Sequence, residues 1–528
     1  MSEKRPCVMD DENGWRLARV WLKVWLKVWS RVWLAWVPGL ILGACASLEP
    51  ALEGQRTLGN LIIQGVPDIP QALVERMQQY RNTRSARLLG WLPEGLLIAT
   101  RFAQTGQVHR VRAPLAVREQ VTFFSEPVTR AYVPPSPDVD GFVYARDIGG
   151  SEFYQLFWFD WQTGQSRLLT DGKSRYTGVL WANGADRFAY TTTERDGRRW
   201  DIHIQDLHGN RSVALETDTG AWEAIDWAPD DDRLLVDQYL SINESYLYEL
   251  DLATGTLTPL LDETIKTSIG TARYDGDGKG VYFTSDLGAE FMRLHYLDLE
   301  TGKIDVLTGG IPWNVEEITV SGDGEYLALT VNEGGFSRLS VWQLPHHTPL
   351  ALSELPRGMI FSLQFSPDGR QLGFGLNSPT APADIYSLDL VERTTTRWTR
   401  SEVGGLDPGG FVEPELVGYP TFDTVDGRPR EIPAFVYRPR GEGPHPVLIN
   451  IHGGPESQIR PYFSATVQYF VNELGIAVIA PNVRGSNGYG KSYLKLDNGY
   501  LREDSVKDIG SLLDWIAEDP DLDAERVG

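Results

Sequence analysis

Two adjacent glycines in the sequence His-Gly-Gly-Pro, residues 452–455, are the first feature that suggests chemistry. They follow residues 447–451, a short apolar run rich in β-branched side chains and preceded by Pro446, which predicts a buried strand. Glycines at the end of a strand leave backbone N–H groups unshielded by side chains. Such groups can stabilise the negative oxygen that forms during acyl transfer. Residues 452–455 could therefore supply one part of an oxyanion hole.

The elements that would position this stretch are predicted on both sides of it. They are strands at residues 416–422 and 432–437 around an Asp426-Gly427 turn, a buried strand at 476–480, an amphipathic helix at 504–517, and the start of a strand at 526–528. This order is typical of the beginning of an α/β-hydrolase sheet. We expect the 476–480 strand to lack a partner on one side. We also expect the helix to turn Val506 and Leu513 inward.

Residues 85–405 are a series of repeats. Units begin near residues 86, 128, 174, 220, 271, 314 and 358, so that the period is 42 to 51 residues. Four short strands in a unit of this length are typical of a β-propeller blade, and we predict seven blades. Asp-x-x-Thr-Gly turns recur at residues 160–164, 251–255 and 298–302. We interpret them as hairpin turns, in which Asp caps the backbone and Gly takes a positive φ, and we expect no metal site.

The predicted fold is mainly β, with a seven-bladed propeller followed by the N-terminal part of an α/β-hydrolase domain. The glycines and proline of residues 404–410 mark the boundary, so the propeller covers residues 85–405 and the hydrolase part covers residues 406–528. Residues 46–84 form a lead-in, with a helix over residues 71–84 that should pack across the domain boundary. Residues 1–45 are predicted to be a signal segment.

Composition restricts the possible partners. A chain of 528 residues is too long for one core, and its net charge of −23 argues against nucleic-acid binding, which needs a basic surface. The two cysteines, Cys7 and Cys45, both lie in the first 45 residues. The folded part therefore has no disulfide and no thiolate metal site. We expect no cofactor.

The first 45 residues resemble a bacterial lipoprotein signal. A basic lead that includes Lys23 and Lys27 precedes an apolar segment at residues 32–42, which is too short to span a bilayer and ends in Leu-Gly-Ala-Cys. This resemblance implies lipidation of Cys45 and a periplasm-facing place in the cell envelope, where Ser47 favours the outer membrane. The alternatives are an uncleaved anchor, an ordinary secretory signal, or a misassigned start codon and a cytoplasmic protein.

Residues 147–155 depart from the blade repeat. They place two glycines and an acid, Glu152, between two predicted blade strands. One interpretation is a longer hairpin with a solvated glutamate. The other is that Glu152 points toward the hydrolase cleft and binds a substrate amine.

Together, several stretches resemble the prolyl oligopeptidase family of serine peptidases, above all its acylaminoacyl-peptidase and dipeptidyl-peptidase branches. They are residues 446–455, residues 482–490, Asp504, Asp508 and Trp515. In the propeller part, Gly90-Trp91, residues 126–128 and the Gly-Gly-Ser-Glu stretch at 149–152 also fit, and the resemblance covers about residues 55–528. It implies a hydrolase that cleaves short peptides without a cofactor or a metal ion. A membrane would be contacted only through the lipid anchor.

The resemblance also implies roles for residues of the hydrolase part. The N–H of Gly454 corresponds to one oxyanion donor. His452 would orient its loop rather than act as the base, because the family's base comes near the C-terminus. Arg484 is expected to pair with a carboxylate, either Asp504 or Asp508, and substrate binding is its alternative role.

The family's catalytic triad is missing from this sequence. In the family, the strand begun at residues 526–528 leads into a Gly-x-Ser-x-Gly elbow, followed by Asp and His. The 528 residues contain no such elbow and no histidine after His452. Ser486 is not a substitute, because Arg484 stands where the first glycine would be. We therefore expect a chain truncated before the nucleophile and inactive by itself.

Two other classes of protein remain as alternatives. A periplasmic binding propeller of the Tol-Pal type leaves residues 416–528 unexplained. A carboxylesterase-like hydrolase would explain those residues but rarely carries a propeller.

Overall fold

The computed structural model describes residues 55–454 and 456–528. The chain separates into two compact units, Met1–Pro70 and Gln71–Gly528. In the described part of the first unit, β1 (Arg56–Leu58) and β2 (Leu61–Ile63) form a hairpin. The predicted signal segment, with Cys45, lies outside the described residues. Among the helices of the described residues, none is long and apolar enough to cross a membrane.

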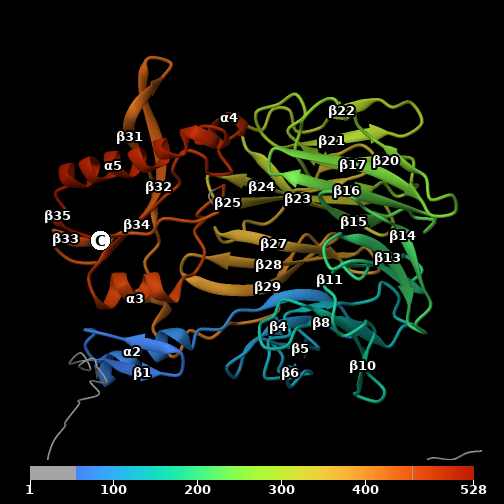
Figure 1. The fold of residues 1–528 in the computed structure, drawn as a ribbon, viewed down its shortest axis with the longest axis horizontal. Helices are drawn as coiled ribbons and strands as arrows, with labels where there is room; N and C mark the ends of the chain where they lie inside the picture. Colours follow the sequence, from blue (N-terminus) through green and yellow to red (C-terminus); the bar gives the residue numbers. More distant parts are fainter. Residues whose placement is uncertain (1–54, 455) are drawn as a thin grey trace, which may run out of the picture. The chain divides into compact units, whose positions relative to one another are not determined.

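Seven four-stranded antiparallel sheets form a β-propeller, which confirms the prediction (Figure 1). Each sheet is one contiguous stretch of chain, and each first strand begins within two residues of a predicted unit start.

The strands of the blades are, in order, β3 (Arg87–Trp91), β4 (Leu96–Thr100), β5 (Gln107–Val111) and β6 (Arg118–Gln120) in blade 1; β7 (Arg130–Tyr132), β8 (Gly141–Arg146), β9 (Gln155–Asp160) and β10 (Ser166–Leu168) in blade 2; β11 (Tyr176–Trp181), β12 (Arg187–Thr192), β13 (Asp201–Asp206) and β14 (Arg211–Leu215) in blade 3; β15 (Ala221–Trp227), β16 (Arg233–Ser241), β17 (Glu244–Asp251) and β18 (Leu257–Pro259) in blade 4. They continue with β19 (Ile269–Tyr274), β20 (Gly280–Ser285), β21 (Arg293–Asp298) and β22 (Ile304–Val306) in blade 5; β23 (Asn314–Val320), β24 (Tyr326–Glu333), β25 (Phe336–Gln343) and β26 (Thr348–Pro349) in blade 6; β27 (Met359–Phe365), β28 (Gln371–Ser378), β29 (Ala381–Asp389) and β30 (Thr395–Arg397) in blade 7.

The Asp-x-x-Thr-Gly turns have the hairpin geometry that the sequence predicts. The carboxylate of Asp160 accepts the backbone N–H of Thr163 at 2.8 Å, and Gly164 has a φ of 66°. In the turns at residues 251–255 and 298–302, the threonine N–H again donates to the aspartate carboxylate, and the glycine again has a positive φ. These aspartates therefore cap backbone groups of their own turns.

The propeller closes between blades 1 and 7 without a strand shared by the two sheets. The backbone N–H of Arg84 donates to Glu402 O at 2.8 Å, and that of Ala86 donates to Ala383 O at 2.8 Å. The helix before blade 1, α2 (Gln71–Arg81), ends three residues earlier than predicted, because the chain then extends to pair with residue 403.

The hydrolase part is a five-stranded sheet in the order β31-β32-β34-β33-β35. Its elements are η1 (Pro408–Gly410), β31 (Glu415–Val425), β32 (Arg428–Tyr437), β33 (His445–Ile449), α3 (Ala465–Glu473), β34 (Ala477–Pro481), α4 (Lys491–Leu494), η2 (Gly499–Leu501), α5 (Glu503–Glu518) and β35 (Leu522–Val527). β33 runs parallel to both β34 and β35. α3 and α5 lie on opposite faces of the sheet (Figure 1).

Two expectations for this sheet were wrong. The 476–480 strand was expected to have a free edge, but β34 lies between β32 and β33, because the hairpin strand β32 pairs with its other side. Val506 and Leu513 of α5 are 67% and 45% exposed rather than turned inward. The buried stripe of the helix is narrower than predicted, and it includes a charged residue, Asp508.

Candidate active site

The ends of β33 and β34 bring the predicted chemical residues together. The two strands are parallel neighbours, so their carboxyl ends lie at the same edge of the sheet. Residues 452–455 follow β33, and residues 482–490 follow β34. In open α/β sheets, ligands bind outside the carboxyl ends of the strands. This edge is therefore the candidate active site.

Gly454 has the backbone geometry of an available donor. Its φ is 124°, a conformation that side chains rarely adopt, and the residue is exposed. Among the described residues, none accepts a hydrogen bond from its N–H. A Cβ at this position would lie 3.1 Å from Ser457 Cβ. Glycine is therefore required for this path of the chain, and its N–H is free to bind a ligand oxygen.

His452 contacts Ser486 across the two loops. His452 Nε2 lies 2.8 Å from Ser486 Oγ, whose own hydroxyl donates to Val483 O at 2.6 Å. His452 Nδ1 lies 3.1 Å from Gly453 O, so both ring nitrogens contact polar groups. Ser486 is 0% exposed, so a substrate cannot reach it. The contact joins the two loops and does not form a nucleophile–base pair.

Arg484 is buried and forms ion pairs with two carboxylates. Its guanidinium donates to Asp508 at 2.8 and 2.9 Å and to Asp423 at 2.9 Å, and it lies 4.2 Å from the centre of the Phe422 ring. Burial acts to raise the pKa of Asp423, but the hydrogen bonds from Arg484 and Arg430 outweigh it and lower that pKa. Arg484 is 2% exposed, so a substrate cannot reach it, and we assign this residue to loop anchoring.

The propeller meets the hydrolase part on the face where the second strands of the blades end and the third strands begin. Lys491 Nζ pairs with Asp286 of blade 5 at 2.8 Å. In blade 7, Asn377 Oδ1 accepts the backbone N–H of Phe463 at 2.9 Å. Because blades are related by rotation about the propeller axis, equivalent loops share one face. The loop with Glu152 is the equivalent one in blade 2, so it belongs to the hydrolase-facing side.

The backbone N–H of Glu152 forms a hydrogen bond, whereas its carboxylate is exposed to solvent. Its φ is 61°, after Gly149 and Gly150 at 64° and 72°, and its N–H donates to Asp147 Oδ2 at 2.9 Å. The residue is exposed, and within the described part of the chain no group pairs with its carboxylate. The binding of a substrate amine at this position stays a prediction.

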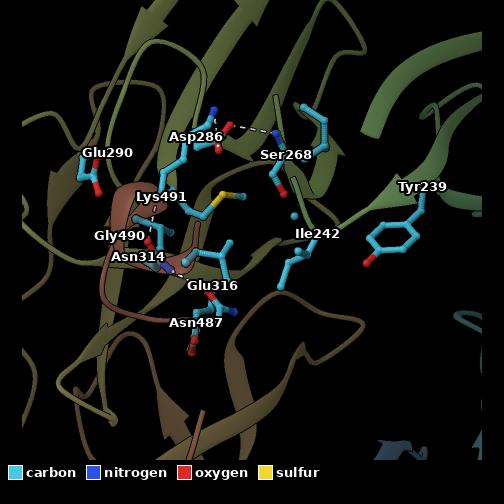
Figure 2. A pocket seen from close by; sticks show the side chains of 15 residues that line it. Tyr239, Ile242, Ser268, Asp286, Glu290, Asn314, Glu316, Asn487, Gly490 and Lys491 are labelled. Carbon is cyan, nitrogen blue, oxygen red and sulfur yellow. Dashed lines mark hydrogen bonds and ion pairs between the residues drawn. The ribbon is translucent and has the colours of Figure 1, made fainter. Parts of the chain in front are cut away.

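A cavity of about 270 Å³ between the propeller and the hydrolase part was not predicted from the sequence (Figure 2). Its polar residues include Asp286, Asn314, Asn487 and Lys491. Glu290 also lies on it, and its carboxylate accepts from the backbone N–H and the hydroxyl of Ser492 at 2.6 and 2.8 Å. Asp286 and Glu290 lie in a blade loop, Asn314 begins a blade strand, and Asn487 and Lys491 follow β34. Each is an ordinary polar residue in its own segment, so the sequence pattern gives no signal for the cavity. Among the described residues, no cluster of His, Cys, Asp or Glu could hold a metal ion.

Two family models match the chain. The model described as "Prolyl oligopeptidase, N-terminal beta-propeller domain" matches residues 129–401, and the model described as "Prolyl oligopeptidase family" matches residues 461–528.

Curated relatives and a solved structure agree with these matches. The chain is 24% identical to dipeptidyl aminopeptidase BIII of Pseudoxanthomonas mexicana over 71% of this chain and 55% of that protein. It is 22% identical to dipeptidyl-peptidase 5 of Porphyromonas gingivalis over 66% of this chain and 45% of that protein. It therefore spans about half the length of these relatives. The crystal structure of a puromycin hydrolase shares the fold, with a TM-score of 0.71 and 19% identity over 84% of this chain and 73% of that one.

Proposed function

The chain belongs to the prolyl oligopeptidase family, and from this premise we propose that it forms the propeller and the oxyanion side of a serine peptidase for short peptides. The cleavage would be of the aminopeptidase, acylaminoacyl-peptidase or dipeptidyl-peptidase type. The observation that supports this most is the exposed N–H of Gly454, at the carboxyl end of a central parallel strand. Similarity to two dipeptidyl peptidases supports the proposal that the substrates have a free N-terminus.

The proposed chemistry assigns Gly454 a single task. When a nucleophile attacks the scissile carbonyl, the oxygen becomes negative and accepts the Gly454 N–H. A second donor comes from the residue after the nucleophile in the Gly-x-Ser-x-Gly elbow. The 528 residues contain neither that elbow nor a histidine after His452. We propose that they do not hydrolyse peptides by themselves, because acyl transfer needs a serine and a base.

The propeller would select the substrate. The ends of its second strands and the loops after them contact the hydrolase part at blades 5, 6 and 7, so a substrate would lie between the propeller and the hydrolase part. Such an enclosed position favours short peptides over folded proteins. Glu152, from the equivalent loop of blade 2, would pair with the terminal ammonium group of the substrate.

Two proteins test this function: the full 528-residue chain, and a completed chain in which it is followed by the C-terminal segment of dipeptidyl aminopeptidase BIII. Both are incubated with acylaminoacyl and dipeptidyl nitroanilides and with a fluorophosphonate probe. We expect turnover and labelling only in the completed chain. Turnover by the 528 residues, abolished by Ser486→Ala, would overturn the proposed inactivity. A well-folded completed chain that hydrolyses none of these substrates would overturn the proposed peptidase function.

A further inference from the structure

The loop that carries Gly454 is attached to the propeller as well as to its own domain. We call residues 452–463 the Gly454 loop; all of them except Pro455 are described. Arg460 of this loop donates from Nε to Gly335 O at 2.8 Å, from Nη1 to Glu316 Oε2 at 2.7 Å and from Nη2 to Ser337 Oγ at 2.9 Å. Gly335, Glu316 and Ser337 all belong to blade 6. One side chain of the loop is thus held at three points by the propeller.

A second contact from the same blade reaches the loop two residues earlier. Asn332 is 1% exposed, and its Nδ2 donates to Gln458 Oε1 at 2.7 Å and to Glu316 Oε1 at 2.8 Å. Its own Oδ1 accepts the N–H of Gly335 at 2.9 Å. Glu316 is therefore shared: one carboxylate oxygen binds Arg460 and the other binds Asn332. These bonds form one network that includes Gln458 and Arg460 of the loop.

The hydrolase domain holds the opposite side of the loop. Asn482 Oδ1 accepts the backbone N–H of Ile459 at 2.7 Å, and Asn482 Nδ2 donates to Ile459 O at 3.0 Å. The backbone N–H of Asn487 donates to Glu456 O at 3.1 Å. Asn487 also lies beside Asn314 at the cavity between the domains, where Glu316 is another lining residue (Figure 2). The loop is thus clamped between the segment after β34 and blade 6.

We propose that Glu316 and Arg460 are positioning residues for the oxyanion donor, so that blade 6 fixes the loop that presents Gly454 N–H. This inference rests on the proposed function. An oxyanion donor acts only when its hydrogen points to the place where the negative oxygen forms. Gly454 and Gly453 are exposed and contribute no side chain to hold their own segment. The fixed points nearest to them along the described chain are His452 on one side and residues 456–460 on the other. Loss of the blade 6 contacts would remove the propeller side of the second support, residues 456–460.

Other contacts between the domains provide a matched control. Lys491 pairs with Asp286 of blade 5 at 2.8 Å, so it too is a hydrolase cation bound to a propeller carboxylate. Lys491, however, opens the short helix α4 and lies outside the Gly454 loop. Lys491→Met and Arg460→Met each remove one ion pair from the same interface, and Arg460→Met also removes two hydrogen bonds to blade 6. Only Arg460→Met acts on the Gly454 loop.

Hydrogen exchange in the full 528-residue chain tests the positioning without requiring activity. Amide exchange of peptides from residues 452–463 is compared among wild type, Glu316→Gln, Arg460→Met and Lys491→Met. We expect exchange in this loop to rise about tenfold or more in the first two variants, since a hydrogen bond to a charged group is lost. In Lys491→Met, we expect faster exchange near residues 486–494 only. Unchanged loop exchange in both Glu316→Gln and Arg460→Met would overturn the proposal.

Kinetics in the completed chain separate positioning from general stability. We expect Glu316→Gln to lower kcat about tenfold while KM stays within about twofold, as for an interaction used in the transition state. A rise in KM at unchanged kcat would contradict the positioning role. If Arg460→Met fails to fold, Glu316→Gln decides the question, because it keeps the size of the side chain. If the completed wild-type chain is inactive, the proposed function fails, whereas the exchange experiment still decides whether blade 6 holds the loop.

Discussion

Arg484 and Asp508 form a bidentate ion pair inside the hydrolase part: Arg484 Nε and Nη2 donate to the two carboxylate oxygens of Asp508 at 2.9 and 2.8 Å. The backbone N–H of Arg484 donates to the same carboxylate at 3.0 Å. Asp508 belongs to α5, whereas Arg484 follows β34. The pair therefore ties the loop that contains Ser486 to a helix, and it explains why a charged residue occupies the buried stripe of that helix.

The first prediction is that Arg484→Met destabilises the hydrolase part by about 3–5 kcal/mol, because it leaves the negative charge of the buried Asp508 without its cation. Equilibrium urea unfolding measures this change. Arg370→Ala is the control, since Arg370 pairs with Asp389 at the surface at 3.4 Å and its removal should cost less than about 1 kcal/mol. Equal changes in the free energy of unfolding would show that the buried Arg484–Asp508 pair stabilises the fold no more than a surface pair does.

The second prediction compares the two glycines of the oxyanion stretch. At Gly454, a Cβ would be strained by the φ of 124° and would crowd Ser457, so Gly454→Ala must move the N–H. At Gly453, a Cβ would meet no atom within 4 Å. In the completed chain, we expect Gly454→Ala to lower kcat on the order of 10²-fold, as for the loss of one oxyanion donor. Gly453→Ala should have little effect, and an equal loss from both would contradict the assignment of Gly454.

The propeller could be predicted almost completely from the sequence, because its signals are local. A turn such as residues 160–164 fixes its hairpin through contacts between residues three and four positions apart. The same turn recurs in other blades, so the blade count and the strand starts follow from repetition. The hydrolase strands were predicted as elements for the same reason.

The arrangement of elements and the contacts between domains could not be predicted in this way. The position of β34 between β32 and β33 depends on pairing between distant segments, which a hydrophobic pattern does not encode. Glu316 and Arg460 are 144 residues apart, and each is an ordinary charged residue in its own segment. Only the folded chain brings them together, and with them the support of the Gly454 loop.

The third prediction concerns pH and Asp237, which lies opposite Glu223 on neighbouring strands of blade 4. Burial and then the negative charge of Glu223 raise the pKa of Asp237 to about 7. An unfolded chain has an aspartate pKa of about 3.9. The folded state therefore keeps a proton that the unfolded state releases, so this group stabilises the fold below about pH 4 and loses that contribution as pH rises to about 7.

The measurement is the midpoint temperature of thermal unfolding of Asp237→Asn and wild type at pH 5 and pH 8. Because Asn cannot ionise, the stability of the variant relative to wild type should increase between these values. Asp305→Asn is the control, since Asp305 is exposed and pairs with Lys303 at 2.9 Å. A difference that is constant with pH would show that Asp237 does not titrate as described.

The fourth prediction concerns Cys45, outside the described residues. If the chain is lipidated there, globomycin or Cys45→Ala should leave the precursor unprocessed and without acyl chains. Mass spectrometry of the N-terminal peptide and membrane fractionation measure both effects. A mature protein that lacks lipid and begins elsewhere would refute the lipoprotein signal, and with it the proposed place in the outer membrane.

The last prediction tests Glu152 as the group that binds the substrate amine. Its carboxylate is exposed on the hydrolase-facing side of the propeller, and a free peptide N-terminus offers a cation that an N-blocked peptide lacks. In the completed chain, Glu152→Gln should raise KM for free-amine dipeptidyl substrates by about tenfold or more, since a charge-assisted bond is lost, and should change KM for N-blocked substrates little. Glu94→Gln is the control, because it removes the same charge from a loop between the first and second strands of a blade, on the other face. Equal changes for both substrate types would make Glu152 a residue of its hairpin only.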